Sequence, residues 1–220
     1  MTTELLARPW RARCIRDQRR LGCQFKRCLD VVATLVGGLL LAPFLLVVAI
    51  LIKLDSPGPI IFKQYRVGLN GRPFELYKFR TMVADAEERR SALTAYNQST
   101  GPLLKIENDP RITRIGRFLR AFSIDEFPQL INVLRGDMSL VGPRPLPVAD
   151  WDFYRGRPED ARHDVPPGMT GLWQVGGRSS TTGERMLELD LAYVRTWSFL
   201  MDLRILLRTF PAVFRRSGAY

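Results

Sequence analysis

The sequence predicts a mostly helical α+β protein, with one membrane helix near the N-terminus, a small β-hairpin, and amphipathic interfacial helices around a cytosolic site. Three observations support this fold class. Residues 31–52 form an apolar run without a charge, residues 60–82 contain two strand-like stretches around Asn70-Gly71, and residues 111–122 repeat arginines and apolar residues at helical spacing. We therefore expect one folded unit with a membrane-inserted N-terminal part.

The apolar run at 31–52, VVATLVGGLLLAPFLLVVAILI, is long enough to enter a bilayer. About 20 such residues span a hydrocarbon core about 30 Å thick. Basic residues flank the run on both sides, which places both ends in the cytoplasm by the positive-inside rule. Pro43, near the centre, removes one backbone hydrogen bond and favours a kink. Two topologies stay open on this basis, a helix that bends and returns to the side of entry and a kinked single-pass helix. A buried core helix is disfavoured, because nothing later in the chain is apolar enough to surround it.

Composition limits the chemistry that the chain can perform. The 33 basic and 22 acidic residues give a net charge of +11, which favours an anionic partner such as nucleic acid, an acidic bilayer surface or a phosphorylated substrate. A single histidine, His163, argues against Ser-His-Asp hydrolysis and histidine metal sites. Neither a Walker A loop nor a G-x-G-x-x-G fingerprint occurs. Any catalysis must therefore use carboxylates, lysines and arginines.

Three further elements follow along the chain. Aromatic and β-branched stretches joined through Asn70-Gly71 predict a β-hairpin within 60–82, and the polar run 83–96 favours a solvated helix. The segment 111–122 predicts a basic amphipathic helix, either packed on the protein core or lying in the lipid headgroup layer. Its apolar face holds Ile112, Ile115, Leu119 and Phe122, and its basic face holds Arg111, Arg114, Arg117 and Arg120. Residues 188–216 repeat this amphipathic pattern.

The segment SIDEFPQL, residues 123–130, carries the acidic pair Asp125-Glu126. Ser123 and Glu126 match a capping box, but a helix capped by Asp125 with Pro128 in its first turn fits better. Either arrangement places the pair at a helix N-terminus, where the dipole favours ionised carboxylates and attracts phosphate oxygens. The pair is therefore either a helix cap without chemistry or a nucleophile beside a phosphate.

Several cations stand in sequence contexts that suit phosphate binding. Prolines on both sides of Arg144 restrict its backbone and could hold the guanidinium ready for a bidentate phosphate contact, although a rigid surface turn has the same pattern. The loop at 166–178 offers glycines for close backbone approach and Trp173 for stacking, as many plain turns do. The candidate set is Lys78, Arg80, Arg120, Arg144 and Arg178. Together these residues supply cations for a diphosphate, and the acidic pair supplies a carboxylate to attack it.

Four motifs carry a family resemblance. They are KRCLD at 26–30, YKFRTM at 77–82, SIDEFPQLINVLRGDMSLVGPRP at 123–145 and PPGMTGLWQVGGR at 166–178. On these residues the chain resembles the monotopic polyprenyl-phosphate phosphoglycosyl transferases of bacteria, which initiate exopolysaccharide and glycan assembly. The resemblance extends from about Lys26 to the C-terminus. One departure is Ala42-Pro43, where many members have Ser-Pro at the helix break, so the break must rest on Pro43 alone.

The resemblance implies a topology and a mechanism. The chain would consist of a basic tail at 1–25, a re-entrant membrane helix at 26–54 and a cytosolic, membrane-associated catalytic domain at 55–220, on the cytoplasmic face of the bacterial inner membrane. In a ping-pong reaction, Asp125 would attack the β-phosphate of a UDP-sugar and UMP would leave. The hexose-1-phosphate would then pass to undecaprenyl phosphate. Glu126 and Asp125 would hold Mg²⁺, and the five cations would contact phosphates and nucleotide.

The resemblance also sets expectations about partners. We expect a UDP-sugar, undecaprenyl phosphate, inner-membrane lipids and a second copy of the chain as partners, and no nucleic acid. The short chain and its ending RRSGAY are similar to compact exopolysaccharide starters, which favours galactose or glucose as the sugar. The alternative is a membrane-anchored basic adaptor without enzymatic activity, in which the arginines bind anionic lipid and the acidic pair only caps a helix.

Overall fold

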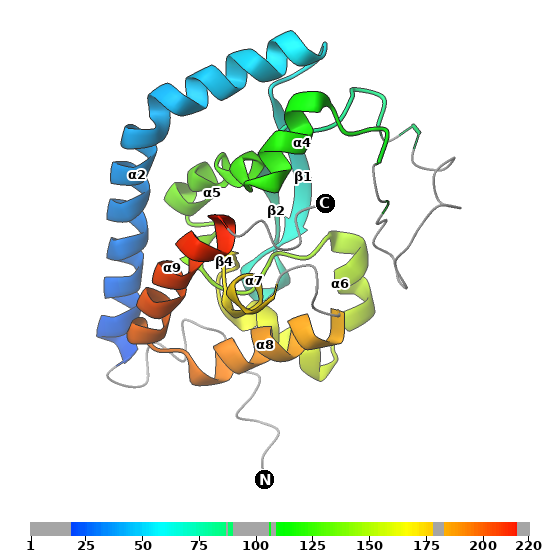
Figure 1. Ribbon diagram of the computed structural model, residues 1–220. Coiled ribbons are helices and arrows are strands. Elements are labelled where there is room, and N and C mark those ends of the chain that lie inside the picture. Colours follow the sequence, from blue (N-terminus) through cyan, green and yellow to red (C-terminus); the bar gives the residue numbers. More distant parts are fainter. Residues whose placement is uncertain (1–18, 87, 90–105, 107–108, 178–182, 215–220) are drawn as a thin grey trace.

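The computed structural model describes residues 19–86, 88–89, 106, 109–177 and 183–214 (Figure 1). It is mostly helical with two small sheets, as the sequence predicts. The helices are α2 (Arg19–Asp55), α4 (Arg114–Ala121), α5 (Gln129–Arg135), α6 (Val148–Tyr154), α7 (Leu172–Gly176), α8 (Gly183–Thr196) and α9 (Phe199–Phe214). The strands are β1 (Ile61–Val67), β2 (Pro73–Phe79), β3 (Ser139–Val141) and β4 (Gly168–Thr170), and the 3₁₀ turns are η1 (Leu69–Gly71), η3 (Ile124–Glu126) and η4 (Pro158–Asp164).

Helix α2 contains the apolar run and is bent. It begins at Arg19, earlier than the predicted membrane segment at 26–54, and Pro43 is its one internal proline. Figure 1 shows a long arm along the side of the molecule and a shorter arm that turns across the top. Within the described residues, α2 is the one helix long and apolar enough to cross a membrane, with a mean hydropathy of 2.9. Only 11% of the apolar 18-residue stretch of this helix is buried within the protein. A core helix in a soluble protein is mostly buried, so this exposure fits contact with lipid.

The long arm of α2 is fixed to the rest of the molecule by a buried polar cluster around Asp202 of α9. Lys26 Nζ lies 2.7 Å from Asp202 Oδ2 and donates a second hydrogen bond to the Val141 carbonyl at 2.9 Å. The Tyr193 hydroxyl and the Trp197 indole N–H also donate to the Asp202 carboxylate. Helices α2, α8 and α9, or the connections between them, thus meet at one carboxylate, and Lys26 links this cluster to β3.

The short arm of α2 packs on a different part of the same folded unit. Val48 and Ile52 are buried in an apolar cluster with Phe79 of β2, Leu119 of α4 and Ile124 of η3. Both ends of the helix therefore rest on the protein, whereas the region near the bend is exposed. Leu39 and Leu40 are 77% and 76% exposed.

The predicted β-hairpin is confirmed. Strands β1 and β2 pair antiparallel, from Ile61 opposite Phe79 to Val67 opposite Pro73. Asn70 and Gly71 lie in the turn between them with φ angles of 56° and 72°. Both angles are in the left-handed region that Asn and Gly adopt most readily, which explains why this dipeptide marks the turn.

The segments on either side of residues 90–105 differ from the predictions. Residues 84–86 and 88–89 form turns instead of the helix predicted over 83–96, because the backbone of Val83 is bonded to Arg111. Residues 87 and 90–96 lie outside the described structure. Helix α4 begins only at Arg114, where Thr113 caps it by accepting a hydrogen bond from the Gly116 N–H. Its apolar face packs on the protein core through Leu119, and Arg111 is buried in an ion pair with Asp109.

We predict that Asp202→Asn destabilises the fold by about 3–5 kcal/mol, because it leaves the Lys26 ammonium buried without its charge partner. Chemical denaturation in detergent micelles measures this change. The matched control is Glu188→Gln, which breaks the exposed pair with Arg185 and should cost at most about 1 kcal/mol. Equal stability of the two variants would contradict the proposed role of the buried pair.

Candidate functional site

The acidic pair lies in η3, a single 3₁₀ turn between α4 and α5. Asp125 does not cap α5, contrary to the prediction, since the helix begins at Gln129 and has no side-chain cap. The first N–H groups of α5 instead bond backward within the chain, Leu130 N to the Phe127 carbonyl and Ile131 N to the Pro128 carbonyl. The two residues that connect η3 to α5 thus supply the acceptors for these N–H groups, and the two carboxylates stay available for other contacts.

Glu126 is held between two cations. Lys78 Nζ and Arg144 Nη2 each lie 3.0 Å from the same carboxylate oxygen, Oε1. Burial alone would raise the pKa of Glu126, but Arg144 and Lys78 together hold it well below its ordinary value. Glu126 therefore stays ionised and fixes the positions of both cations.

Asp125 has a different environment from its neighbour. It is 9% exposed, and none of the described residues hydrogen-bonds to its carboxylate. Burial raises the pKa of Asp125 above its ordinary value, and although Lys78 opposes this, the adjacent charge of Glu126 adds to it. Adjacent carboxyl groups whose pKa values are shifted in opposite directions are typical of active sites in which the two have separate roles.

Lys78 and Arg144 reach Glu126 from different parts of the fold. Lys78 comes from β2, opposite Phe62 of β1. Arg144 follows β3, which pairs in parallel with β4, and its guanidinium lies over the Trp173 ring with Cζ 5.3 Å from the centroid. The ring that the sequence offered for stacking is thus in contact with an arginine.

Close backbone packing and a buried ion pair fix the turn that carries Arg144. The Gly142 and Gly168 backbones approach so closely that a Cβ on Gly168 would lie 2.0 Å from the Gly142 nitrogen. Arg162 is buried, pairs with Asp190 and donates a 2.8 Å hydrogen bond to the Arg144 carbonyl. The backbone of Arg144 therefore has little freedom, which favours a preorganised guanidinium.

The remaining predicted cations divide into three cases. Arg120 lies near the acidic pair, with Nε donating to Thr81 Oγ1 at 2.9 Å; burial lowers its pKa and Asp125 partly restores it. Arg80 does not join the group around Glu126. Its guanidinium binds the carbonyls of Ile52, Ser56 and Pro57 at the end of α2. Arg178 lies outside the described residues.

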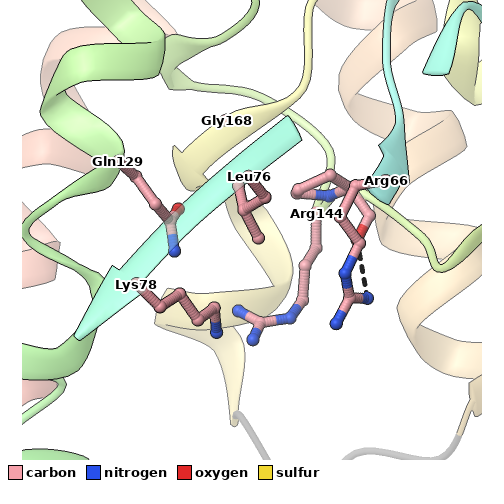
Figure 2. Close-up of a pocket in the computed structure, with 7 residues that line it drawn as sticks. Arg66, Leu76, Lys78, Gln129, Arg144 and Gly168 are labelled. Atoms are coloured by element: carbon pink, nitrogen blue, oxygen red, sulfur yellow. Dashed lines mark hydrogen bonds between the residues drawn. The ribbon is translucent and has the colours of Figure 1, made fainter. Parts of the chain in front are cut away.

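A hollow beside Glu126 contains two residues that the sequence did not single out as site residues. The hollow is open to solvent, and the empty space in it and at its mouth is about 230 Å³. Figure 2 shows Lys78, Arg144 and Arg66 side by side along it, with Gln129 near Lys78. The hairpin register could have indicated Arg66, because Gln64 and Arg66 share the face of the hairpin that carries Leu76 and Lys78. No local signal marks Gln129.

Asp125 and Glu126 can hold a magnesium ion if the phosphates of a bound substrate supply further oxygen ligands. Within the described part of the chain, no group of three or more His, Cys, Asp or Glu side chains is placed to hold a metal. Oε1 of Glu126 is taken by Lys78 and Arg144, while Oε2 accepts no hydrogen bond from a described residue. Mg²⁺ is commonly held by one or two carboxylates together with waters and substrate phosphates. Asp125 and Glu126 match that pattern if phosphate oxygens complete the shell.

Comparison with protein families finds a match over most of the chain. Residues 21–216 match the family described as "Bacterial sugar transferase". The match covers most of the chain, including α2, the acidic pair and the hollow.

Three relatives illustrate the range of similar proteins. Galactosyl transferase CpsE of Streptococcus agalactiae is 45% identical over 195 residues, which cover 88% of this chain and 43% of that protein. The UDP-glucose:undecaprenyl-phosphate glucose-1-phosphate transferase of Caulobacter vibrioides is 49% identical over 202 residues, which cover 89% of this chain and 72% of that protein. Exopolysaccharide production protein ExoY of Rhizobium meliloti is 37% identical over 206 residues, which cover 92% of this chain and 91% of that protein. The chain thus spans less than half the length of CpsE and nearly all of ExoY.

Proposed function

The chain belongs to the bacterial sugar transferase family, and from this premise we propose that it transfers a hexose-1-phosphate from a UDP-sugar to undecaprenyl phosphate and releases UMP. The names of the Caulobacter and Streptococcus relatives support glucose or galactose as the sugar. The name of the Rhizobium relative supports a role in exopolysaccharide production. In this proposal the chain catalyses the first membrane step of exopolysaccharide or glycan assembly.

The buried, unbonded carboxylate of Asp125 carries the proposal, because it can serve as the nucleophile. One of its oxygens attacks the β-phosphorus of the UDP-sugar, and the bond from this phosphorus to the bridging oxygen breaks. UMP leaves with the electron pair, and the hexose phosphate is bound to Asp125. A phosphate oxygen of the lipid then attacks the same phosphorus and releases the Asp125 carboxylate. Atoms and charge balance in both steps, which gives a ping-pong sequence.

The charges around Asp125 suit this reaction. A carboxylate approaches a phosphoryl group only when the negative phosphate oxygens are neutralised, and Lys78, Arg144 and Arg120 lie close enough to do so. Asp125 is also more basic than an ordinary aspartate, which increases its nucleophilicity once it is ionised. We assign Arg80 to holding the end of α2, since its contacts are with that helix.

Mg²⁺ fits this site as a further neutralising group, with Glu126 and Asp125 as its protein ligands. When bound, Mg²⁺ supplies Lewis-acid polarisation of phosphate oxygens. Glu126 is suited to hold it because its pKa lies below the ordinary value, so that the carboxylate is ionised at any pH at which the enzyme would work.

Replacing the nucleophile tests the function directly. Asp125→Asn should reduce UMP release by at least about 1,000-fold, because an amide cannot form the phosphosugar adduct. The measurement is UMP release from a panel of UDP-hexoses with undecaprenyl phosphate present, together with mass spectrometry of the intact protein after incubation with UDP-sugar alone. Wild-type protein should gain the mass of a hexose phosphate, and the variant should not.

The matched control is Asp152→Asn, which makes the same change on an exposed aspartate of α6. It should retain both adduct and turnover. If the wild-type protein forms no adduct and releases no UMP from any UDP-hexose, the enzyme proposal fails and the adaptor alternative gains support.

Metal removal gives an independent expectation. Chelation with EDTA should abolish UMP release by the wild-type protein, and Mg²⁺ should restore it, because the phosphate charges would otherwise repel the carboxylates. Glu126→Gln should raise the Mg²⁺ concentration needed for half-maximal activity. Full activity in EDTA would refute the metal assignment while leaving the transfer reaction intact.

The packing of α2 supports a re-entrant helix on the cytoplasmic face of the membrane. Lys26 at one end and Ile52 at the other are both buried on the same folded unit. A single-pass helix would place its two ends on opposite sides of a core about 30 Å thick. Leu39 and Leu40, which are largely exposed, lie just before Pro43, where a re-entrant helix would reach deepest.

Cysteine labelling tests this topology. In a background with the native cysteines replaced by serine, the exposed positions Gln24 and Pro59, one at each end of α2, are changed to cysteine. Asp152→Cys serves as the control for the cytosolic domain. A membrane-impermeant maleimide should label none of the three in intact spheroplasts and all three in inside-out vesicles, since all would face the cytoplasm. Labelling of one end of α2 from outside would show a single-pass helix.

A further inference from the structure

Arg66 is a half-buried cation without a carboxylate partner. Nε and Nη2 donate to Gln64 Oε1 at 3.2 and 2.7 Å, and Nη1 lies 3.4 Å from the Pro145 carbonyl. All of these acceptors are neutral. No described carboxylate lies within ion-pair distance of the Arg66 guanidinium. Burial lowers the pKa of Arg66 to about 10, and the charge of Arg144 contributes to this fall.

Three other arginines are neutralised by carboxylates: Arg111 pairs with Asp109, Arg162 with Asp190, and Arg144 with Glu126. Arg80 is also buried without an ion pair to a described residue, but its guanidinium binds backbone carbonyls at the end of α2 and does not line the hollow. A buried charge without a partner is costly, and its presence beside an open hollow indicates a place for an anionic ligand.

The hollow offers further groups for such a ligand. Arg144 lies between Lys78 and Arg66 in Figure 2, and Glu126 pairs with Lys78 and Arg144 but not with Arg66. Gln129 lines the hollow near Lys78. Its side chain is 3% exposed, and its amide makes no hydrogen bond with a described residue. The hollow is open to solvent and is lined by cations, which suits an anionic group that enters from outside.

The row of cations leads away from the acidic pair's nucleophile. Asp125 interacts electrostatically with Lys78, Arg120 and Arg144, whereas Arg66 is not among its partners. Arg66 interacts with Arg144, Asp150 and Glu126. Lys78 and Arg144 both contact Glu126, the neighbour of Asp125, whereas Arg66 lies beyond Arg144 in Figure 2. In an in-line displacement the leaving group departs on the side opposite the nucleophile.

We propose that Arg66, with Arg144, forms the subsite for the phosphate that stays on the nucleotide of the donor. This inference rests on the proposed transfer reaction. Breaking the bridging bond moves one further negative charge onto the leaving nucleotide phosphate. Arg66 has no carboxylate to compete for its donors, so its interaction with this phosphate strengthens as the charge develops. The group that Arg66 binds is thus a nucleoside monophosphate, held by its phosphate.

Binding of UMP and of uridine to the full-length protein tests the subsite. Arg66→Gln should weaken UMP binding by about 10- to 100-fold, the range for loss of hydrogen bonds to a charged group, and should leave uridine binding unchanged. Arg66→Lys keeps the charge but loses the planar fork, and should have an intermediate effect. The matched control is Arg72→Gln, which removes the same charge from an exposed position of the same hairpin and should alter UMP affinity less than about twofold. Thermal unfolding of each variant checks that it is folded.

Steady-state kinetics separate this subsite from the acceptor site. In a ping-pong reaction, Arg66→Gln should lower kcat/KM for the UDP-sugar by a similar factor and leave kcat/KM for undecaprenyl phosphate unchanged. Equal UMP affinity in folded Arg66→Gln and wild-type protein would overturn the assignment, as would a loss confined to the lipid phosphate. If wild-type protein releases no UMP at all, the transfer function itself fails. That result differs from active wild-type protein with an unaffected Arg66 variant.

Discussion

The buried ion pair between Lys26 and Asp202 is the interaction on which the arrangement of the molecule depends. It joins the membrane-facing helix α2 to α9, while Tyr193 binds the same carboxylate from α8. Lys26 and Tyr193 both donate to the carbonyl of Val141, the last residue of β3. The turn that carries Arg144 begins at the next residue. The cluster around Asp202 therefore fixes the position of α2 and also the position of the strand end that leads to Arg144.

The two carboxylates of the acidic pair differ in how their charge is compensated by nearby cations. Glu126 contacts both Lys78 and Arg144 through one carboxylate oxygen. Arg162, which pairs with Asp190, fixes the backbone of Arg144 by a hydrogen bond to its carbonyl. Asp125, by contrast, is buried and accepts no hydrogen bond from a described residue, which suits its proposed role as a nucleophile that changes partners. In this proposal, ion pairs position the cations of the site, and the group that reacts is left without one.

Local features of the fold could be predicted from the sequence, and features that depend on tertiary contacts could not. The Asn70-Gly71 hairpin and the bend of α2 follow from backbone preferences of single residues, so both were predicted. The prediction that Asp125 caps α5 was wrong, because the helix begins later, at Gln129, and its first N–H groups bond to the carbonyls of Phe127 and Pro128. Arg80 and Arg66 could not be distinguished by sequence context. Only the folded chain shows that Arg80 binds the carbonyls at the end of α2 and that Arg66 faces the hollow.

The contacts of Arg80 have a consequence for the geometry of the whole enzyme. Arg80 follows β2 directly and binds the carbonyl end of α2, and Lys78 lies two residues before it in the same chain. Arg80 therefore ties the end of the short arm of α2 to strand β2, which carries Lys78. In the proposed topology, this contact would fix the distance between the site and the hydrocarbon layer that α2 enters. A nucleotide from the cytoplasm and the headgroup of a lipid would then meet at a constant depth.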